Sequence, residues 1–188
     1  MKKAAIFFAE GYEEIEALTV VDMCRRAGID IRMVSVTGAE HVTSSHGVCV
    51  KMDAQISDLD FESLDMLILP GGMPGTKNLE QVPALTAQLK AFADSGKYVC
   101  AICAAPSVLG HLGILNGKKA VCYPGFEQDL SGAQVLKKSC VVDGNVITAR
   151  GMGCAIEFSK AIITALADAE TAQKTADSVI YRVSEDDQ

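Results

Sequence analysis

The residue with the clearest chemical potential is Cys103, which directly follows a short apolar segment at residues 98–102. Pro106 comes three residues later, and proline is well tolerated in the first turn of a helix. The pattern therefore predicts a strand that turns into a helix at or just after Cys103. Unpaired amide groups at a helix N-terminus stabilise a thiolate, so we expect Cys103 to be a nucleophile.

A pair of glycines follows a second apolar segment, residues 66–69, in the sequence Pro70-Gly71-Gly72. Parallel strands bring their carboxyl ends to the same edge of a sheet, which is where ligands bind in α/β folds. Glycines at that edge would let the backbone approach the Cys103 sulfur. The backbone amides of Gly72 and Ala104 are our candidates for an oxyanion pocket, with Gly71 beside them.

Glu16 is the candidate partner of the cysteine. In a helix spanning about 13–27, its side chain points to the same side as the apolar Val20 and Met23. A carboxyl group at the head of a buried stripe must be paired or protonated. The simpler interpretation, which we favour for Glu13 and Glu14, is an acid that compensates the helix dipole.

Two negative charges could not coexist at this place. A thiolate and a carboxylate about 4 Å apart repel by roughly 4 kcal/mol at an effective dielectric constant of 20. Such a pair shares one proton. We predict a protonated Glu16 that donates a hydrogen bond to a Cys103 thiolate.

Other residues have simpler interpretations. Cys100 completes a Cys-x-x-Cys sequence with Cys103 but falls within the predicted strand, which disfavours a redox pair. The three histidines show no metal-ligand spacing, so we expect neither a metal nor another cofactor. Arg150 precedes a predicted helix. It either binds an anion or, as we favour, belongs to a structural ion pair.

Buried strands alternate with helices along the chain. We predict strands at 4–8, 31–36, 66–69, 98–102 and 120–123, and helices at 13–27, 83–95, from about 105, at 154–166 and at 170–181. A β excursion is expected over 37–57, and a hairpin turns at Asp143-Gly144. This order indicates a mostly parallel sheet covered on both faces, a three-layer α/β fold. One domain is expected over residues 1–183, with a disordered tail at 184–188.

The composition limits the function classes. The formal net charge is −7 and the 17 lysines and arginines are scattered, which disfavours a nucleic-acid groove. The uncharged stretch 98–117 contains a proline and three glycines, so a membrane span is disfavoured. No signal peptide opens the sequence, and the seven cysteines, an odd number, indicate free thiols. We expect a cytoplasmic protein that binds neither nucleic acid nor membrane.

Three motifs in order resemble the DJ-1/ThiJ/PfpI superfamily, and the nearest branch resembles the bacterial ThiJ-type relatives of DJ-1. They are Glu13-Glu14-Ile15-Glu16, Leu69-Pro70-Gly71-Gly72 and Ala101-Ile102-Cys103-Ala104-Ala105-Pro106. The resemblance runs from about Lys3 to Tyr181 and implies a flavodoxin-like sandwich, similar to class I glutamine amidotransferases.

The resemblance also implies functional residues. The family's reactive, easily oxidised cysteine falls at Cys103, its hydrogen-bonding glutamate at Glu16, and its oxyanion amides at Gly72 and Ala104. It further implies a homodimer that packs through the helix at 13–27. That helix and its surroundings offer Glu14, Arg26 and His46 as interface or near-site residues.

Departures from the family pattern narrow the chemistry. Tyr123-Pro124 stands where DJ-1 has a histidine and a proline, and Ala104 stands where the PfpI-type branch has a histidine. The His-x-Glu of the amidotransferases is absent, and residues 149–154 read Ala-Arg-Gly-Met-Gly-Cys instead of Ser-Arg-Gly-Pro-Gly-Thr. Without a histidine base, protease and amidotransferase activities are disfavoured.

Three functions remain open from the sequence. The first is attack by Cys103 on a small reactive carbonyl compound such as a 2-oxoaldehyde, similar to the glyoxalase or deglycase activity of relatives. Glu16 would move the proton, and Tyr123 could assist. The second is a redox or oxidative-stress protein in which Cys103 becomes a sulfinate. The third is a chaperone-like dimer without turnover.

Overall fold

A seven-stranded sheet forms the centre of the computed structural model, which describes residues 2–181. Its strands are β1 (Lys3–Phe8), β2 (Asp30–Ser35), β5 (Ala54–Gln55), β6 (Met66–Leu69), β7 (Tyr98–Ile102), β10 (Cys140–Asp143) and β11 (Val146–Ala149). They are arranged in the order β10-β11-β7-β6-β1-β2-β5, and only β10 and β11 pair antiparallel. The predicted three-layer fold with a mostly parallel sheet is confirmed.

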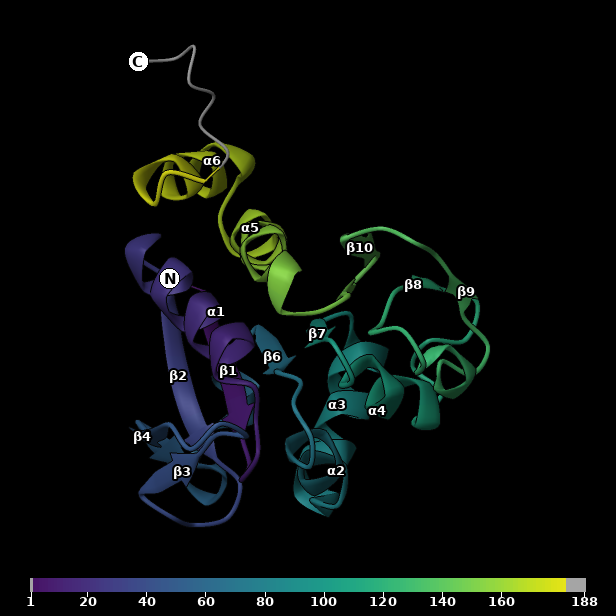
Figure 1. The fold of residues 1–188 in the computed structure, drawn as a ribbon, viewed down its shortest axis with the longest axis horizontal. Coiled ribbons are helices and arrows are strands. Elements are labelled where there is room, and N and C mark those ends of the chain that lie inside the picture. Colours follow the sequence, from purple (N-terminus) through teal and green to yellow (C-terminus); the bar gives the residue numbers. More distant parts are fainter. Residues whose placement is uncertain (1, 182–188) are drawn as a thin grey trace.

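Helices cover both faces of this sheet (Figure 1). They are α1 (Glu14–Arg26), α2 (Gly75–Glu80), α3 (Pro83–Ser95), α4 (Pro106–His111), α5 (Ala155–Leu166) and α6 (Ala169–Ser178). The side chains of β1 divide the core between the two faces, because neighbouring residues of a strand point in opposite directions. Ile6 and Phe8 pack with α1, α5 and α6, whereas Ala5 and Phe7 pack with α2, α3 and α4.

Helix α1 places Glu16 at the site for reasons visible in its sequence. Its first turn carries Glu14 and Glu16 and its last turn carries Arg25 and Arg26, so both ends complement the helix dipole. Gly28 follows with a φ of +75°, the left-handed conformation that ends helices. The buried residues of α1 include Val20 and Met23 as well as Glu16, as the predicted stripe requires.

The remaining strands form two small sheets. The predicted β excursion contains β3 (His41–Thr43) and β4 (Cys49–Lys51), which pair antiparallel. The predicted Asp143-Gly144 hairpin is confirmed as the connection between β10 and β11. Strand β8 (Lys119–Ala120) pairs with β9 (Gln134–Val135) outside the main sheet.

Two predicted boundaries were wrong and one helix was missed. The strand predicted at 120–123 ends at Ala120, because the Val121 amide donates to Thr148 Oγ1 and the chain then turns over Cys103. Helix α2, which begins at a glycine and has only six residues, was not predicted. The last helix ends at Ser178 instead of 181, two residues before Ile180 with its φ of +59°.

Residues 184–188, predicted to be a disordered tail, lie outside the described residues, as do 182 and 183 at the end of the predicted domain. Among residues 2–181, no helix is both long and apolar enough to span a membrane.

Candidate active site

Cys103 lies at a sharp turn between β7 and α4. Its φ is +65°, a left-handed conformation that is uncommon for any residue with a side chain. Two hydrogen bonds hold it there: its N–H donates to the Ala149 carbonyl at 2.9 Å, and its carbonyl accepts from the Tyr123 N–H at 2.8 Å. Such a conformation costs about 1–3 kcal/mol and persists only where the surroundings impose it. The arrangement is that of a nucleophile elbow, which presents its side chain at the edge of the sheet.

Glu16 reaches the same point from the first turn of α1. Only 1% of its surface is exposed. Its Oε2 accepts a hydrogen bond from the Gly71 N–H at 2.9 Å, and its carboxyl group also shares a hydrogen bond with the Cys103 thiol. The fold thus brings together two residues that are far apart in the sequence.

Gly71 makes this contact possible because it has no side chain. A Cβ atom at position 71 would lie 2.5 Å from Cys103 Cβ and 2.5 Å from Glu16 Oε2, closer than real Cβ contacts allow. Gly72 is equally constrained, since its φ is +91° and a Cβ there would lie 2.4 Å from the Glu13 backbone nitrogen. The two glycines let the loop after β6 pass between α1 and the elbow.

Two backbone amides point at the sulfur. The N–H groups of Ala104 and Gly72 form hydrogen bonds with Cys103, and both lower its pKa. These are the two amides that we named from the sequence as candidates for an oxyanion pocket. An oxygen anion bound on a carbon attached to this sulfur would have the same two donors at hand.

The pKa values of the pair differ from the sequence-based expectation. Burial, followed by the charge and hydrogen bond of Glu16, raises the pKa of Cys103 to about 12. Burial likewise raises the pKa of Glu16 to about 7, against the lowering effect of its hydrogen bonds to Cys103 and Gly71. The amide of Ala104, just before α4, lowers the pKa of Cys103 in the predicted direction, but burial and Glu16 outweigh it.

These directions define the protonation chemistry of the site. The pair loses one proton near pH 7 and the second only in strong alkali. Loss of the first proton leaves either a carboxylate beside a thiol or a carboxylic acid beside a thiolate, and the hydrogen bond connects the two forms. The nucleophilic form is therefore available at neutral pH only when Glu16 holds the remaining proton.

A cavity of about 370 Å³ opens over the sulfur. The sequence pointed to five of the residues that line it, which are Glu16, His46, Gly72, Cys103 and Ala104, and to Tyr123 as a pocket residue. It missed Glu13, Met73, Phe126 and Met152, which complete the wall. They lie in loops or at helix ends, where no periodic pattern reveals which way a side chain points.

His46 stands at the mouth of this cavity and is paired with acids. Its Nδ1 lies 3.0 Å from Glu14 Oε1 and 3.7 Å from Glu13 Oε2, and the hydrogen bond to Glu14 raises the pKa of His46. The carboxylate oxygens of Glu13 and Glu14 and the ring nitrogen of His46 that could bind a metal ion lie within 4.8 Å of one another. The spacing of these residues in the sequence did not predict this grouping. Arg26, by contrast, pairs with Asp22 on the outer face of α1.

Arg150 does not line the Cys103 cavity but a neighbouring one of about 390 Å³, which shares Tyr123 and Met152 with it. The ion pair that we favoured for Arg150 is absent from the described part of the chain. Cys100 is fully buried, and burial raises its pKa well above the ordinary value, as expected for a core cysteine.

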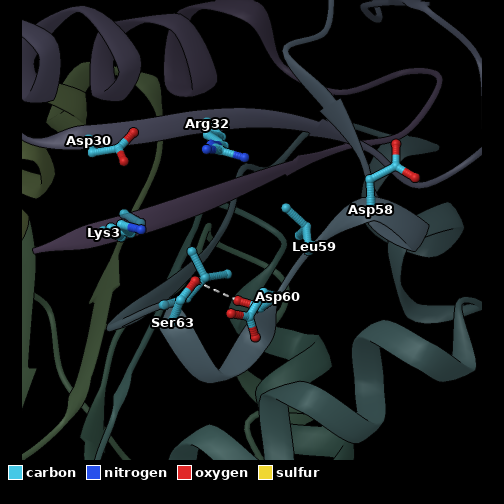
Figure 2. A pocket seen from close by; sticks show the side chains of 9 residues that line it. Lys3, Asp30, Arg32, Asp58, Leu59, Asp60 and Ser63 are labelled. Carbon is cyan, nitrogen blue, oxygen red and sulfur yellow. Dashed lines mark hydrogen bonds between the residues drawn. The ribbon is translucent and has the colours of Figure 1, made fainter.

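A further cavity of about 240 Å³ lies at the opposite edge of the sheet, where β1 and β2 begin (Figure 2). Lys3 and Arg32 line it together with Asp30, Asp58 and Asp60, so its charges oppose one another. No cysteine or histidine is among the residues that line it. The cavity above Cys103 remains the better candidate for chemistry.

The chain is similar to a known protein family, to curated proteins and to a solved structure. Residues 2–165 match the DJ-1/PfpI family. The chain is 34% identical to "Protein dj-1beta" of Drosophila melanogaster over 95% of its own length and 97% of that protein. It is also 34% identical to "Protein DJ-1 homolog B" of Arabidopsis thaliana, of which it spans only 43%. The solved structure "Toxoplasma gondii DJ-1, oxidized" superposes with a TM-score of 0.93 at 38% identity, over 97% of this chain and all of that one.

Proposed function

The chain belongs to the DJ-1/PfpI family, and we propose that it converts small reactive carbonyl compounds, 2-oxoaldehydes first among them, through Cys103. The observation that carries the proposal is the hydrogen bond between the Cys103 thiol and a buried carboxyl group whose pKa is raised to about 7. A group with a pKa near the working pH is suited to both accepting and donating a proton.

The residues supply each step of such a conversion. The thiolate form of Cys103 adds to the aldehyde carbon, and the resulting oxygen anion is held by the amides of Gly72 and Ala104. The protonated Glu16 gives its proton to that oxygen and, now a carboxylate, takes the proton from the same carbon and returns it to the adjacent carbonyl carbon. The hydroxyl proton moves to the neighbouring oxygen, giving a 2-hydroxy thioester. Water releases the 2-hydroxy acid and restores the thiol. The sum is one 2-oxoaldehyde plus one water to one 2-hydroxy acid, without a cofactor.

This proposal is tested with methylglyoxal as the substrate. Wild type is expected to convert it to lactate, and Cys103→Ala is expected to lose conversion entirely because it lacks the sulfur that forms the adduct beside Glu16. Cys49→Ala, which removes an exposed cysteine on β4, is the matched control and should keep the wild-type rate. Lactate is measured by chromatography. Equal lactate formation by Cys103→Ala and wild type would refute the proposal.

A second candidate is a redox role for the same thiol. It is favoured by the donors around the sulfur, since the amides of Gly72 and Ala104 and a protonated Glu16 could each bind an oxygen of a sulfinate. The similar Toxoplasma gondii protein is described as oxidized.

A homodimer and a cytoplasmic location stay predictions. The dimer has local support in two exposed apolar residues, Ile15 on α1 and Val48 before β4, which are 48% and 42% exposed.

A further inference from the structure

The cavity beside the Cys103 pocket gathers positive charge. Lys137, Lys138 and Arg150 all line it, in a chain whose formal net charge is −7. Within residues 2–181, none of the three lies within ion-pairing distance of a carboxylate. Arg150 and Lys137 act on the acid Glu127, whose pKa is lowered mainly by backbone hydrogen bonds and to a lesser extent by these two cations. The cavity therefore has more positive than negative charge around it.

The fold explains why these three residues meet. Strands β10 and β11 form an antiparallel hairpin in which Cys140 pairs with Ala149. Lys137 and Lys138 come just before β10 and Arg150 comes just after β11, so the open end of the hairpin brings them together. The Arg150 N–H donates to the Ser139 carbonyl at 3.1 Å and extends the ladder by one residue.

The same segment lies directly beside the reacting pair. The carbonyl of Ala149 accepts the hydrogen bond of the Cys103 N–H at 2.9 Å. At Gly151, a Cβ atom would be 3.3 Å from the Tyr123 ring and 3.9 Å from Glu16 Oε1. Arg150 stands between these two residues, and Tyr123 and Met152 belong to the walls of both cavities. Because the two cavities share these wall residues, they adjoin, and one small substrate could reach from the sulfur toward the cations.

We infer that this second cavity binds the phosphate group of the carbonyl substrate, which makes a phosphorylated three-carbon carbonyl compound the preferred substrate class. A phosphate monoester carries a charge of about −1.5 to −2 near pH 7, which suits three cations better than a single carboxylate does. Arg150 presents a planar fork of donors for two phosphate oxygens, and the lysines add charge. The inference rests on the proposed carbonyl chemistry for its reacting end and on the cation cluster for its anionic end.

Binding is tested without turnover, with glycerol 3-phosphate as a probe that has no carbonyl group. The probe should slow alkylation of Cys103 by iodoacetamide in a saturable way, and glycerol should not. In Arg150→Gln, the half-protecting concentration should rise at least about tenfold, equal to about 1.4 kcal/mol. Arg150→Lys should keep part of the protection, and Lys90→Gln, at an exposed cation on α3, should behave as wild type. Equal protection of wild type and Arg150→Gln, or none in wild type, would overturn the inference.

Preference is tested with a matched pair of substrates, methylglyoxal and its 3-phosphooxy derivative. Wild type should show a kcat/KM at least about tenfold higher for the phosphorylated compound, and Arg150→Gln should lose that ratio. Conversion of methylglyoxal without any preference for phosphate would overturn the inference and leave the carbonyl function standing. Protection by glycerol 3-phosphate without conversion of either aldehyde would instead overturn the carbonyl function, and with it the assignment of the phosphate to a substrate.

Discussion

Graded hydrogen peroxide is expected to add about 32 Da, the mass of two oxygen atoms, to the wild-type chain and to leave Cys103→Ala unchanged at the same dose. The reason is that Cys103 combines access to a cavity with backbone amides that form hydrogen bonds with its sulfur and can hold the new oxygens. Cys24, Cys122 and Cys140 line neither the Cys103 cavity nor its neighbour, so these thiols should react slowly. Intact mass spectrometry gives the readout.

Cys49, which is exposed, and Cys154, which is half-buried and lines the neighbouring cavity, are the competitors in this experiment. Cys49→Ala is therefore the control, and it should gain the two oxygens as readily as wild type. If Cys103→Ala is oxidised as easily as wild type, Cys103 has no special reactivity, and both the redox and the carbonyl functions lose their basis.

As pH rises from 4.5 to 8, the free energy of unfolding of Glu16→Gln is expected to increase by about 3 kcal/mol relative to that of wild type. Burial raises the pKa of Glu16 from its ordinary 4.5 to about 7 in the folded protein. Between these two values the folded state binds more protons than the unfolded state, so wild-type stability falls as pH rises. The loss is complete above pH 7 and absent below pH 4.5. The pKa difference corresponds to about 3 kcal/mol.

Glutamine at position 16 has no proton to lose in this range, and its side-chain oxygen can still accept the Gly71 hydrogen bond. The difference in unfolding free energy between the two proteins, measured with urea at several pH values, isolates the contribution of Glu16 from the other titrating groups. Glu62→Gln, at an exposed acid, is the matched control for the substitution itself. A difference between wild type and Glu16→Gln that does not change with pH would show that Glu16 titrates normally.

Much of the fold could be predicted because its signals are local. Buried strands such as 66–69 and 98–102 appear as short apolar runs, and helix 83–95 begins at a proline and is followed by Gly96 with a φ of +80°. Glu16 could be identified as a site residue from its helical phase alone. The segment 120–123 was wrongly predicted to be a strand throughout, because its apolar residues belong to two different environments. Cys122 enters the core while Tyr123 turns out over Cys103.

The site was harder to predict where it depends on distant segments. No local sequence pattern predicts that Met152 and Phe126 line the same cavity, or that Lys137 and Arg150 line a second one. The pKa of Cys103 could not be predicted from local sequence for the same reason. Proximity to a helix N-terminus argued for a low value, but the depth of burial and the contact with Glu16 depend on how α1 packs beside the elbow.

The shared proton of Cys103 and Glu16 is the central claim, and the pH dependence of Cys103 alkylation tests it most directly. The rate with iodoacetamide is measured from pH 5 to pH 10 by mass spectrometry, in a Cys49→Ala background that removes the exposed thiol. With Glu16 present, the rate should rise through an inflection near pH 7 and then level off, because the pair loses its second proton only near pH 12. With Glu16→Gln, the inflection near pH 7 should vanish and leave one rise set by Cys103 alone. The same inflection near pH 7 in both proteins would show that Cys103 ionises independently of Glu16.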